Sequence, residues 1–100
     1  ILPISWSIPT PPQKVNGEFT VEFSDTNNFI NIITSGKTEY IVGFSNYSLN
    51  IPLVGESGDV QYYRIKNEKK YIDICGNPIP TVSYSEIIDI TIQTNAINSY

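Results

Sequence analysis

The 100-residue sequence contains no histidine and only one cysteine, and these scarcities exclude much catalytic and metal-binding chemistry. Without histidine there is no Ser-His-Asp or Cys-His nucleophile system and no imidazole-based metal site. With Cys75 alone, neither an internal disulfide nor a structural zinc site can form. We therefore expect a protein that is not an enzyme and that uses no metal or other cofactor.

Strong helix formers are also scarce, because the sequence has no methionine, one alanine and three leucines. Isoleucine, valine and threonine together make up nearly a third of the chain, which favours β-strands. Apolar runs extend over two or three residues, too few for a membrane-spanning helix, so we expect no membrane insertion. The composition therefore predicts an all-β protein.

Charged residues are also few. They make up 16% of the chain, against about 25% in an average soluble protein, and the net charge is −4. Serine, asparagine and tyrosine carry much of the polarity instead. An acidic chain has no general attraction for nucleic acid or anionic membranes. The polar but weakly charged composition favours an extracellular, cell-surface or virus-particle location.

Alternation of apolar and polar residues is clearest in the segment 18–24, where Phe19, Val21 and Phe23 share one side. This pattern is typical of a strand with one face on a core and the other in water. Turn signals recur about every ten residues, the spacing expected of a sandwich or barrel. We place the other strands at 29–34, 38–45, 47–54, 59–66, 70–75 and, bent or broken, 81–94. The sequence thus predicts an immunoglobulin-like or jelly-roll type antiparallel β-sandwich of seven to eight strands.

The same alternation predicts the buried side chains of the later strands. Cys75 is expected to be a small buried apolar residue, and Pro52 is expected to place its strand at an edge. The Ser35-Gly36 and Asn67-Glu68 pairs are expected to form turns. The inward-facing residues are predicted to be Tyr40, Val42, Phe44, Tyr47, Leu49, Ile51, Leu53, Ile72, Ile74, Ile88, Ile90 and Ile92.

The first twelve residues differ from the rest, because an alternating apolar segment is followed by three closely spaced prolines. Prolines stiffen the chain and remove amide donors, so we divide the sequence into an extended arm and proline-rich linker, 1–12, and a β-sandwich domain, 13–100. The apolar face of the arm must be buried somewhere. It either pairs with a neighbouring subunit or folds back as the first strand of its own domain. The residues of this candidate subunit interface are Leu2, Ile4, Trp6 and Ile8.

Two surface features indicate binding or modification. Tyr62, Tyr63 and Tyr71 are candidates for a platform on which sugar rings could stack, because tyrosine has a flat face and a polar end. Asn46 begins the sequence Asn-Tyr-Ser, which is a signal for N-linked glycosylation.

Three weaker patterns have simple structural explanations. A carboxylate pair of Asp73 and Asp89 would suit glycosidase chemistry, but alternation places both on solvated faces. The loops 25–28 and 56–59 hold oxygen ligands suited to calcium, although Asx turns explain them equally well. The cations around position 67 are expected to belong to a soluble hairpin tip rather than to a nucleic-acid site.

These observations favour a non-enzymatic structural subunit of an extracellular or particle assembly, such as a pilus, filament, capsid or tail. Its partners would be copies of itself or other subunits, with association by strand addition of the arm. The alternative is a carbohydrate-binding or adhesin-type module whose partners are glycans.

Overall fold

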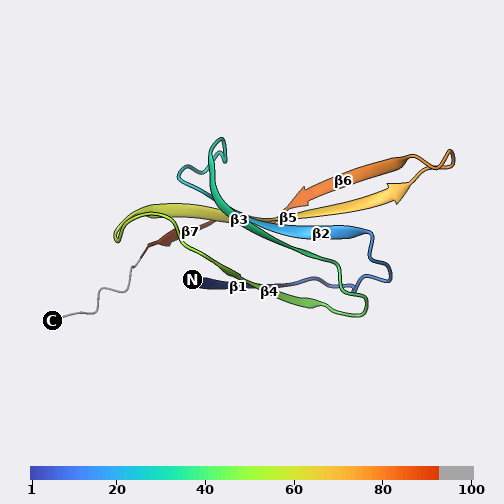
Figure 1. Cartoon of the computed structure of the whole chain (residues 1–100), viewed down its shortest axis with the longest axis horizontal. Helices are drawn as coiled ribbons and strands as arrows, with labels where there is room; N and C mark the ends of the chain where they lie inside the picture. The colour runs from blue at the N-terminus through green and yellow to red at the C-terminus, as the bar shows by residue number, and fades with distance from the viewer. Residues whose placement is uncertain (93–100) are drawn as a thin grey trace.

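The computed structural model describes residues 1–92, which form seven β-strands and no helix (Figure 1). Every strand pairing in this range is antiparallel, and the strands divide into two sheets. The predicted all-β antiparallel sandwich of seven to eight strands is therefore confirmed. The strands are β1 (Leu2–Ser7), β2 (Gly17–Ser24), β3 (Ile32–Glu39), β4 (Asn46–Ile51), β5 (Val60–Ile72), β6 (Pro78–Tyr84) and β7 (Ile88–Thr91).

The larger sheet has the strand order β3-β2-β5-β6, and β7 also pairs with β5. With 13 residues, β5 is longer than β6 and longer than β7. Its first part pairs with β7 and its last part with β6, so the two short strands follow each other along one edge. The smaller sheet consists of β1 and β4 and lies alongside β2 and β3 (Figure 1).

The core lies between the two sheets and is centred on Phe19, Val21 and Phe23 of β2. None of the three is more than 1% exposed, so the inward face predicted for the segment 18–24 is confirmed. The ring centroid of Phe19 lies 4.7 Å from that of Tyr47 in β4 and 5.5 Å from that of Trp6 in β1. Phe19 therefore joins the two sheets. The buried cluster comprises Ile4, Phe19, Val21, Phe23, Tyr40, Tyr47, Ile51 and Ile65, with Leu49 and Leu53 packed at its margin.

The strand predicted at 38–45 is wrong, and so is the predicted burial of Val42 and Phe44. These two side chains are 51% and 56% exposed. The strand β3 occupies 32–39 instead, and residues 41–44 form a turn in which Gly43 has a φ of +83°. The apolar alternation of this segment therefore does not continue a strand.

The error arises from Gly36, because the Ser35-Gly36 pair lies in the middle of β3 rather than in a turn. A Cβ atom at Gly36 would lie 2.8 Å from the Cδ1 of Ile51 in the smaller sheet. The glycine thus leaves room for the Ile51 side chain where the two sheets approach each other, a role that sequence alone does not separate from turn formation.

The strands predicted at 59–66 and 70–75 are one continuous strand, because the Asn67-Glu68 pair lies inside β5. The side chain of Asn67 accepts a hydrogen bond from the hydroxyl of Tyr40. Its neighbour Glu68 lies opposite Glu18 in the ladder with β2. Both residues therefore have partners in the sandwich that replace the local hydrogen bonds of a turn.

The turn that does occur follows β5, where the carboxylate of Asp73 accepts hydrogen bonds from the amides of Cys75 and Asn77 at 2.9 and 2.7 Å. Cys75 is exposed at this tip, so its predicted burial is wrong. The predicted burial of Ile72 and Ile74 is also wrong, since both are exposed. The smaller sheet does not cover this end of β5, and the β5–β6 hairpin projects from the body (Figure 1).

Two other predicted strands begin or end at different residues. The strand placed at 29–34 begins later, because Phe29 has a φ of 57° and Asn28 accepts a hydrogen bond from the amide of Ile30 at 3.2 Å. The strand placed at 47–54 ends immediately before Pro52. Among residues 1–92, β4 has β1 as its single ladder partner, in agreement with the predicted edge position.

The last predicted strand, 81–94, is divided into β6 and β7. Its residues 93–94 lie outside the described part of the chain. The predicted inward face is confirmed for Ile92, which is 1% exposed, and Ile88 and Ile90 are half-buried.

The free edge of β6 contains two prolines at positions where amide donors would face outward. The amide of Ser85 donates to the carbonyl of Ile65, and that of Asp73 to the carbonyl of Asn77, both at 2.9 Å. Because antiparallel hydrogen bonding alternates along a strand, the odd-numbered residues of β6 bond to β5 and the even-numbered residues face the open edge. Pro78 and Pro80 are even-numbered, so this part of the edge has no donors for another strand.

We expect that replacing both Pro78 and Pro80 with threonine increases self-association, because it restores two outward-facing donors to an exposed edge strand. Light scattering over time at fixed concentration is the measurement. The control is Ile79→Thr, which introduces the same residue at a position facing β5. Equal scattering from the control and the double variant would show that the prolines do not protect the edge.

Candidate functional site

The arm lies in the core of its own chain in this structure. β1 pairs with β4 in the register Leu2↔Ile51, Ile4↔Leu49 and Trp6↔Tyr47. Ile4 is 4% exposed, and the Trp6 ring stacks on Tyr47 with centroids 5.9 Å apart. Leu2, Trp6 and Ile8 are partly buried against the core cluster. The four residues of the candidate subunit interface are thus occupied here, and a contact with another subunit requires the arm to exchange its sheet for that of a neighbour.

β1 is an edge strand joined to the body by a segment without strand structure. Among residues 1–92 it pairs with β4 alone, and residues 8–16 form no ladder. Three backbone hydrogen bonds hold this linker segment, from Ile8 to the carbonyl of Ser45 at 2.9 Å, from Gly43 to that of Pro12 at 3.0 Å and from Lys70 to that of Asn16 at 2.7 Å. The arm is therefore attached by one short ladder, its apolar face and these linker contacts.

The three candidate platform tyrosines do not share a surface. Tyr62 and Tyr63 are adjacent in β5 and so lie on opposite faces. The ring of Tyr63 stacks on Phe23 with centroids 5.2 Å apart, which places it at the core. Tyr71 lies eight residues farther along β5 and lines a cleft. Of the three, Tyr71 is the one placed to meet a ligand in a cavity.

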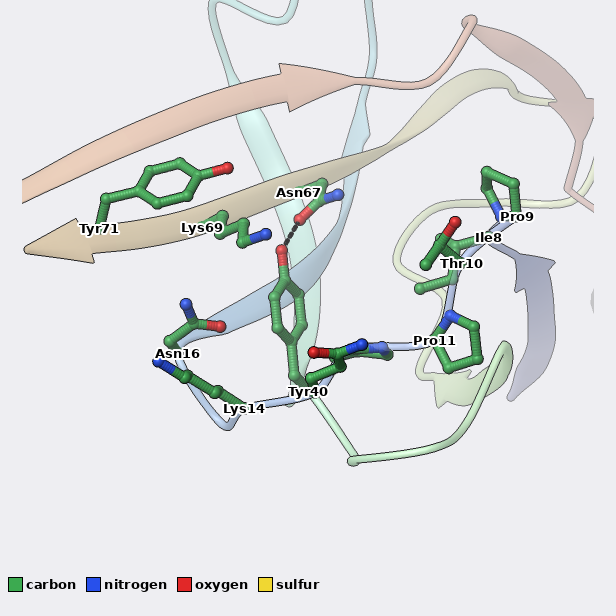
Figure 2. A pocket seen from close by; sticks show the side chains of 12 residues that line it. Ile8, Pro9, Thr10, Pro11, Lys14, Asn16, Tyr40, Asn67, Lys69 and Tyr71 are labelled. Carbon is green, nitrogen blue, oxygen red and sulfur yellow. Dashed lines mark hydrogen bonds between the residues drawn. The ribbon is translucent and has the colours of Figure 1, made fainter.

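This cleft has a volume of about 530 Å³ and separates the linker segment from the inner face of β5 (Figure 2). One wall is proline-rich backbone, and the other carries alternate residues of β5. The register Gly17↔Lys69 brings the segment preceding β2 beside the last part of β5. The lining residues are Ile8, Pro9, Thr10, Pro11, Pro12, Gln13, Lys14, Asn16, Tyr40, Asn67, Lys69 and Tyr71.

Hydrogen bonds fix the polar side chains at the back of the cleft. The Tyr40 hydroxyl donates to the side-chain oxygen of Asn67, as the dashed line in Figure 2 shows. Burial, with smaller contributions from neighbouring tyrosines, raises the pKa of Tyr40, so its hydroxyl stays protonated and remains a donor at neutral pH. The side-chain amide of Asn16 donates to the carbonyl of Lys70 at 3.3 Å, and the Lys70 amide donates to the carbonyl of Asn16 at 2.7 Å.

An ammonium group and an aromatic ring lie at the mouth of the cleft. The Nζ of Lys69 is 5.0 Å from the ring centroid of Tyr71, within the range of a cation–π contact. Sequence reasoning did not select Lys14, Asn16 or Asn67 as site residues. No local motif joins the two segments, which are about fifty residues apart and meet only through the β2–β5 register.

The weaker candidates are dispersed or have structural roles. Asp73 closes the hairpin turn, whereas Asp89 lies opposite Tyr62 near the other end of β5. Eleven residue steps along the chain separate these two positions, or about 36 Å, so the carboxylates do not form a catalytic pair. Asn28 and Asp59 bond to nearby groups in their own turns. Residues 1–92 contain no group of three side chains placed to hold a metal ion.

Three of the four basic residues of β5, at positions 64, 66 and 70, share its outer face, and Lys69 lies on the inner face. Arg64 pairs with Glu22, with Nε and Oε1 2.9 Å apart, and its guanidinium lies between the rings of Phe29 and Tyr84 at 4.2 and 3.9 Å. Glu68 lies between the two lysines of the outer face. Because acidic and basic groups alternate there, the outer face gives no continuous basic track for a nucleic-acid backbone.

The chain was compared with models of protein families, with curated proteins and with solved structures. None of the three comparisons found a match.

The Asn46 side chain of the glycosylation signal is exposed at the start of β4. Within the described residues there is no helix of the length and apolarity needed to cross a membrane.

Proposed function

We propose that this protein is a non-enzymatic structural subunit of an extracellular or particle assembly, in which β1 of one copy completes the sandwich of the next. The observation that carries the proposal is the attachment of β1. This strand supplies buried side chains to the core, yet it lies at a sheet edge and is joined through a proline-rich linker.

Exchange of β1 between copies conserves the contacts that the strand makes within one chain. The side chains of Leu2, Ile4 and Trp6 would enter the same sites in a neighbour, and the same backbone ladder with β4 would form. The free-energy difference between the two arrangements then depends on the linker and on protein concentration. The prolines at 9, 11 and 12 restrict the linker and favour an extended path over a sharp reversal.

The projecting β5–β6 hairpin also suits a subunit. Every residue of β6 is exposed, and large apolar side chains lie on both faces of the hairpin. Apolar groups gathered on one exposed segment are typical of surfaces that become covered by another protein. The exposed residues of this kind are Tyr71, Ile72, Ile74, Ile79, Val82 and Tyr84.

A disulfide between β1 and β4 would test strand exchange. Ser5 and Ser48 are opposite each other, and both side chains are exposed. The hydrogen bond from Ile8 to Ser45 makes them a non-hydrogen-bonded pair, for which Cα atoms are about 4.5 Å apart, within the range that a disulfide spans. We expect the oxidised Ser5→Cys/Ser48→Cys variant, in a Cys75→Ser background, to remain monomeric, because β1 is locked to its own chain.

The mass in solution, measured by size-exclusion chromatography with light scattering at several concentrations, reports the result. The reduced variant and the Cys75→Ser control are expected to form dimers or larger species as concentration rises. Assembly of the oxidised variant to the same extent would exclude β1 exchange as the contact. A control that stays monomeric at all concentrations would contradict the structural-subunit function itself.

A second candidate function is a carbohydrate-binding or adhesin-type module, and the cleft beside Tyr71 favours it. The cleft combines an aromatic ring with amide and hydroxyl groups, the chemistry that sugar rings require. A monomer at all concentrations that binds a sugar in this cleft would support this function over the first.

A further inference from the structure

The cleft is positively charged within an acidic protein. The chain has ten acidic and six basic residues. Among the described residues that line the cleft, by contrast, two are lysines and none is acidic. Lys69 lies on the inner face of β5, whereas Glu18 and Glu68, the nearest acidic residues in the ladder, alternate to the outer face. A ligand in the cleft therefore meets cationic groups without an adjacent carboxylate from these strands.

The side-chain amides of the cleft provide both donors and acceptors. Because Asn67 receives the Tyr40 hydroxyl on its oxygen, its nitrogen points away from Tyr40 with two donors (Figure 2). Asn16 uses its nitrogen to donate to the Lys70 carbonyl, which leaves its oxygen as an acceptor. A compact inorganic anion has no ring of hydroxyl groups that reaches both amides at once, whereas a ligand with hydroxyl groups around a ring satisfies both.

The remaining walls are flat and apolar. Pro9, Pro11 and Ile8 form one side, and the ring of Tyr71 lies at the other end of the cleft (Figure 2). A pyranose ring offers an apolar face to such walls and hydroxyl groups at its edge. The volume of about 530 Å³ is within the range of roughly 300–1,000 Å³ that is typical of small-molecule sites.

We propose that this cleft binds an acidic sugar of the hexuronate class, with the sugar carboxylate at Lys69 and its hydroxyl groups at Asn67 and Asn16. Charge-assisted hydrogen bonds to the Lys69 ammonium group select the acid over the neutral sugar. This inference narrows the second candidate function, on which it rests. It applies to the arrangement in which β1 stays in its own sandwich, because the linker segment forms one wall of the cleft.

Ligand titration followed by two-dimensional amide NMR tests the proposal with three probes. D-glucuronate has the ring and the charge, D-glucose has the ring alone, and inorganic phosphate has the charge alone. We expect D-glucuronate to shift the amide signals of residues 13–16 and 67–71 in a saturable manner. We expect at least about tenfold weaker binding of the other two, since each lacks one set of contacts.

Two neighbouring lysines of β5 provide matched variants. Lys69→Gln removes the ammonium group in the cleft and is expected to weaken D-glucuronate binding about tenfold or more. Lys70→Gln removes the same charge from the opposite face of the strand and is expected to change binding less than twofold. Amide spectra of both variants without ligand establish that each is folded.

Each alternative result overturns the inference in a distinct way. Equal binding of D-glucose would leave a carbohydrate module that does not recognise the acid. Equal binding of phosphate would indicate a general anion site. Absence of saturable shifts with either sugar would contradict both the inference and the second candidate function. If Lys69→Gln and Lys70→Gln weakened D-glucuronate binding equally, the bound anion would lie outside the cleft.

Discussion

Replacing Phe19 with alanine is expected to lower the free energy of unfolding by about 3–5 kcal/mol, the range typical of removing a buried phenyl ring. Phe19 is 1% exposed, and its ring lies within 5.5 Å, between centroids, of those of Trp6, Tyr40 and Tyr47. Trp6 and Tyr47 belong to the smaller sheet and Phe19 to the larger one, so these rings cannot close the cavity without moving the sheets relative to each other. A loss of this size is a large fraction of the stability of a 100-residue domain.

Phe44→Ala is the matched control, because it makes the same chemical change at a side chain that is 56% exposed. We expect it to alter the free energy of unfolding by no more than about 0.5 kcal/mol. Chemical denaturation followed by circular dichroism measures both variants. Similar losses for Phe19→Ala and Phe44→Ala would mean that the turn after β3 is packed in the core, contrary to this structure.

Replacing Gly17 with alanine is expected to destabilise the protein by about 3 kcal/mol, at the upper end of the range for overpacked sites. A Cβ atom at Gly17 would lie 2.5 Å from the backbone carbonyl oxygen of Glu68 and 2.5 Å from the Cζ of Tyr40. The carbonyl belongs to the middle of β5, and Tyr40 is held by its hydrogen bonds to Asn67 and to the Gly17 carbonyl. Neither group can move without breaking an existing contact.

Gly36→Ala gives the comparison for this prediction. The Cβ atom introduced there would meet the Cδ1 of Ile51 at 2.8 Å, but this atom is the end of a flexible side chain and its rotation relieves the contact. We expect a loss of about 1 kcal/mol, the lower end of the range for overpacking. Thermal unfolding of the two variants is the measurement, and a larger loss from Gly36→Ala would contradict the close approach of Gly17 to β5.

The sequence correctly predicted which face of a strand is buried wherever the apolar alternation lies in a strand that packs against the other sheet. The segment 18–24 and the residues Tyr47 and Ile51 satisfy this condition, and all their predicted inward side chains are buried. Val42 and Ile74 alternate equally well but are exposed, because they lie in the turns that follow β3 and β5. Where a strand ends depends on long-range strand pairing, which local periodicity does not contain.

The turns and the cleft were less predictable for a related reason. Glycine and asparagine favour turns, yet Gly36 and Asn67 lie inside strands because partners distant in sequence require a small residue or an amide there. The cleft joins residues 8–16 to residues 67–71 by the register of β2 on β5. Of its polar groups, Tyr71 alone was selected from the sequence, on the basis of side-chain chemistry rather than position.

Cross-linking between two single-cysteine proteins tests the exchange of β1 most directly. Ser5→Cys and Ser48→Cys are prepared separately in the Cys75→Ser background, mixed in equal amounts under assembling conditions and then oxidised. Because each chain carries one of the paired positions, a disulfide between them forms only when β1 of one copy lies on β4 of another.

Mass spectrometry of the intact, non-reduced products gives the yield of the mixed dimer. Mixing Ser5→Cys with Ser35→Cys provides the background, since Ser35 is exposed and faces away from the core on β3. The proposed function predicts that Ser5→Cys and Ser48→Cys form a mixed dimer in a yield well above this background. The yield is expected to rise with protein concentration. A yield no higher than the background, while the double variant in one chain oxidises completely within itself, would show that β1 stays in its own sandwich and would contradict assembly by strand exchange.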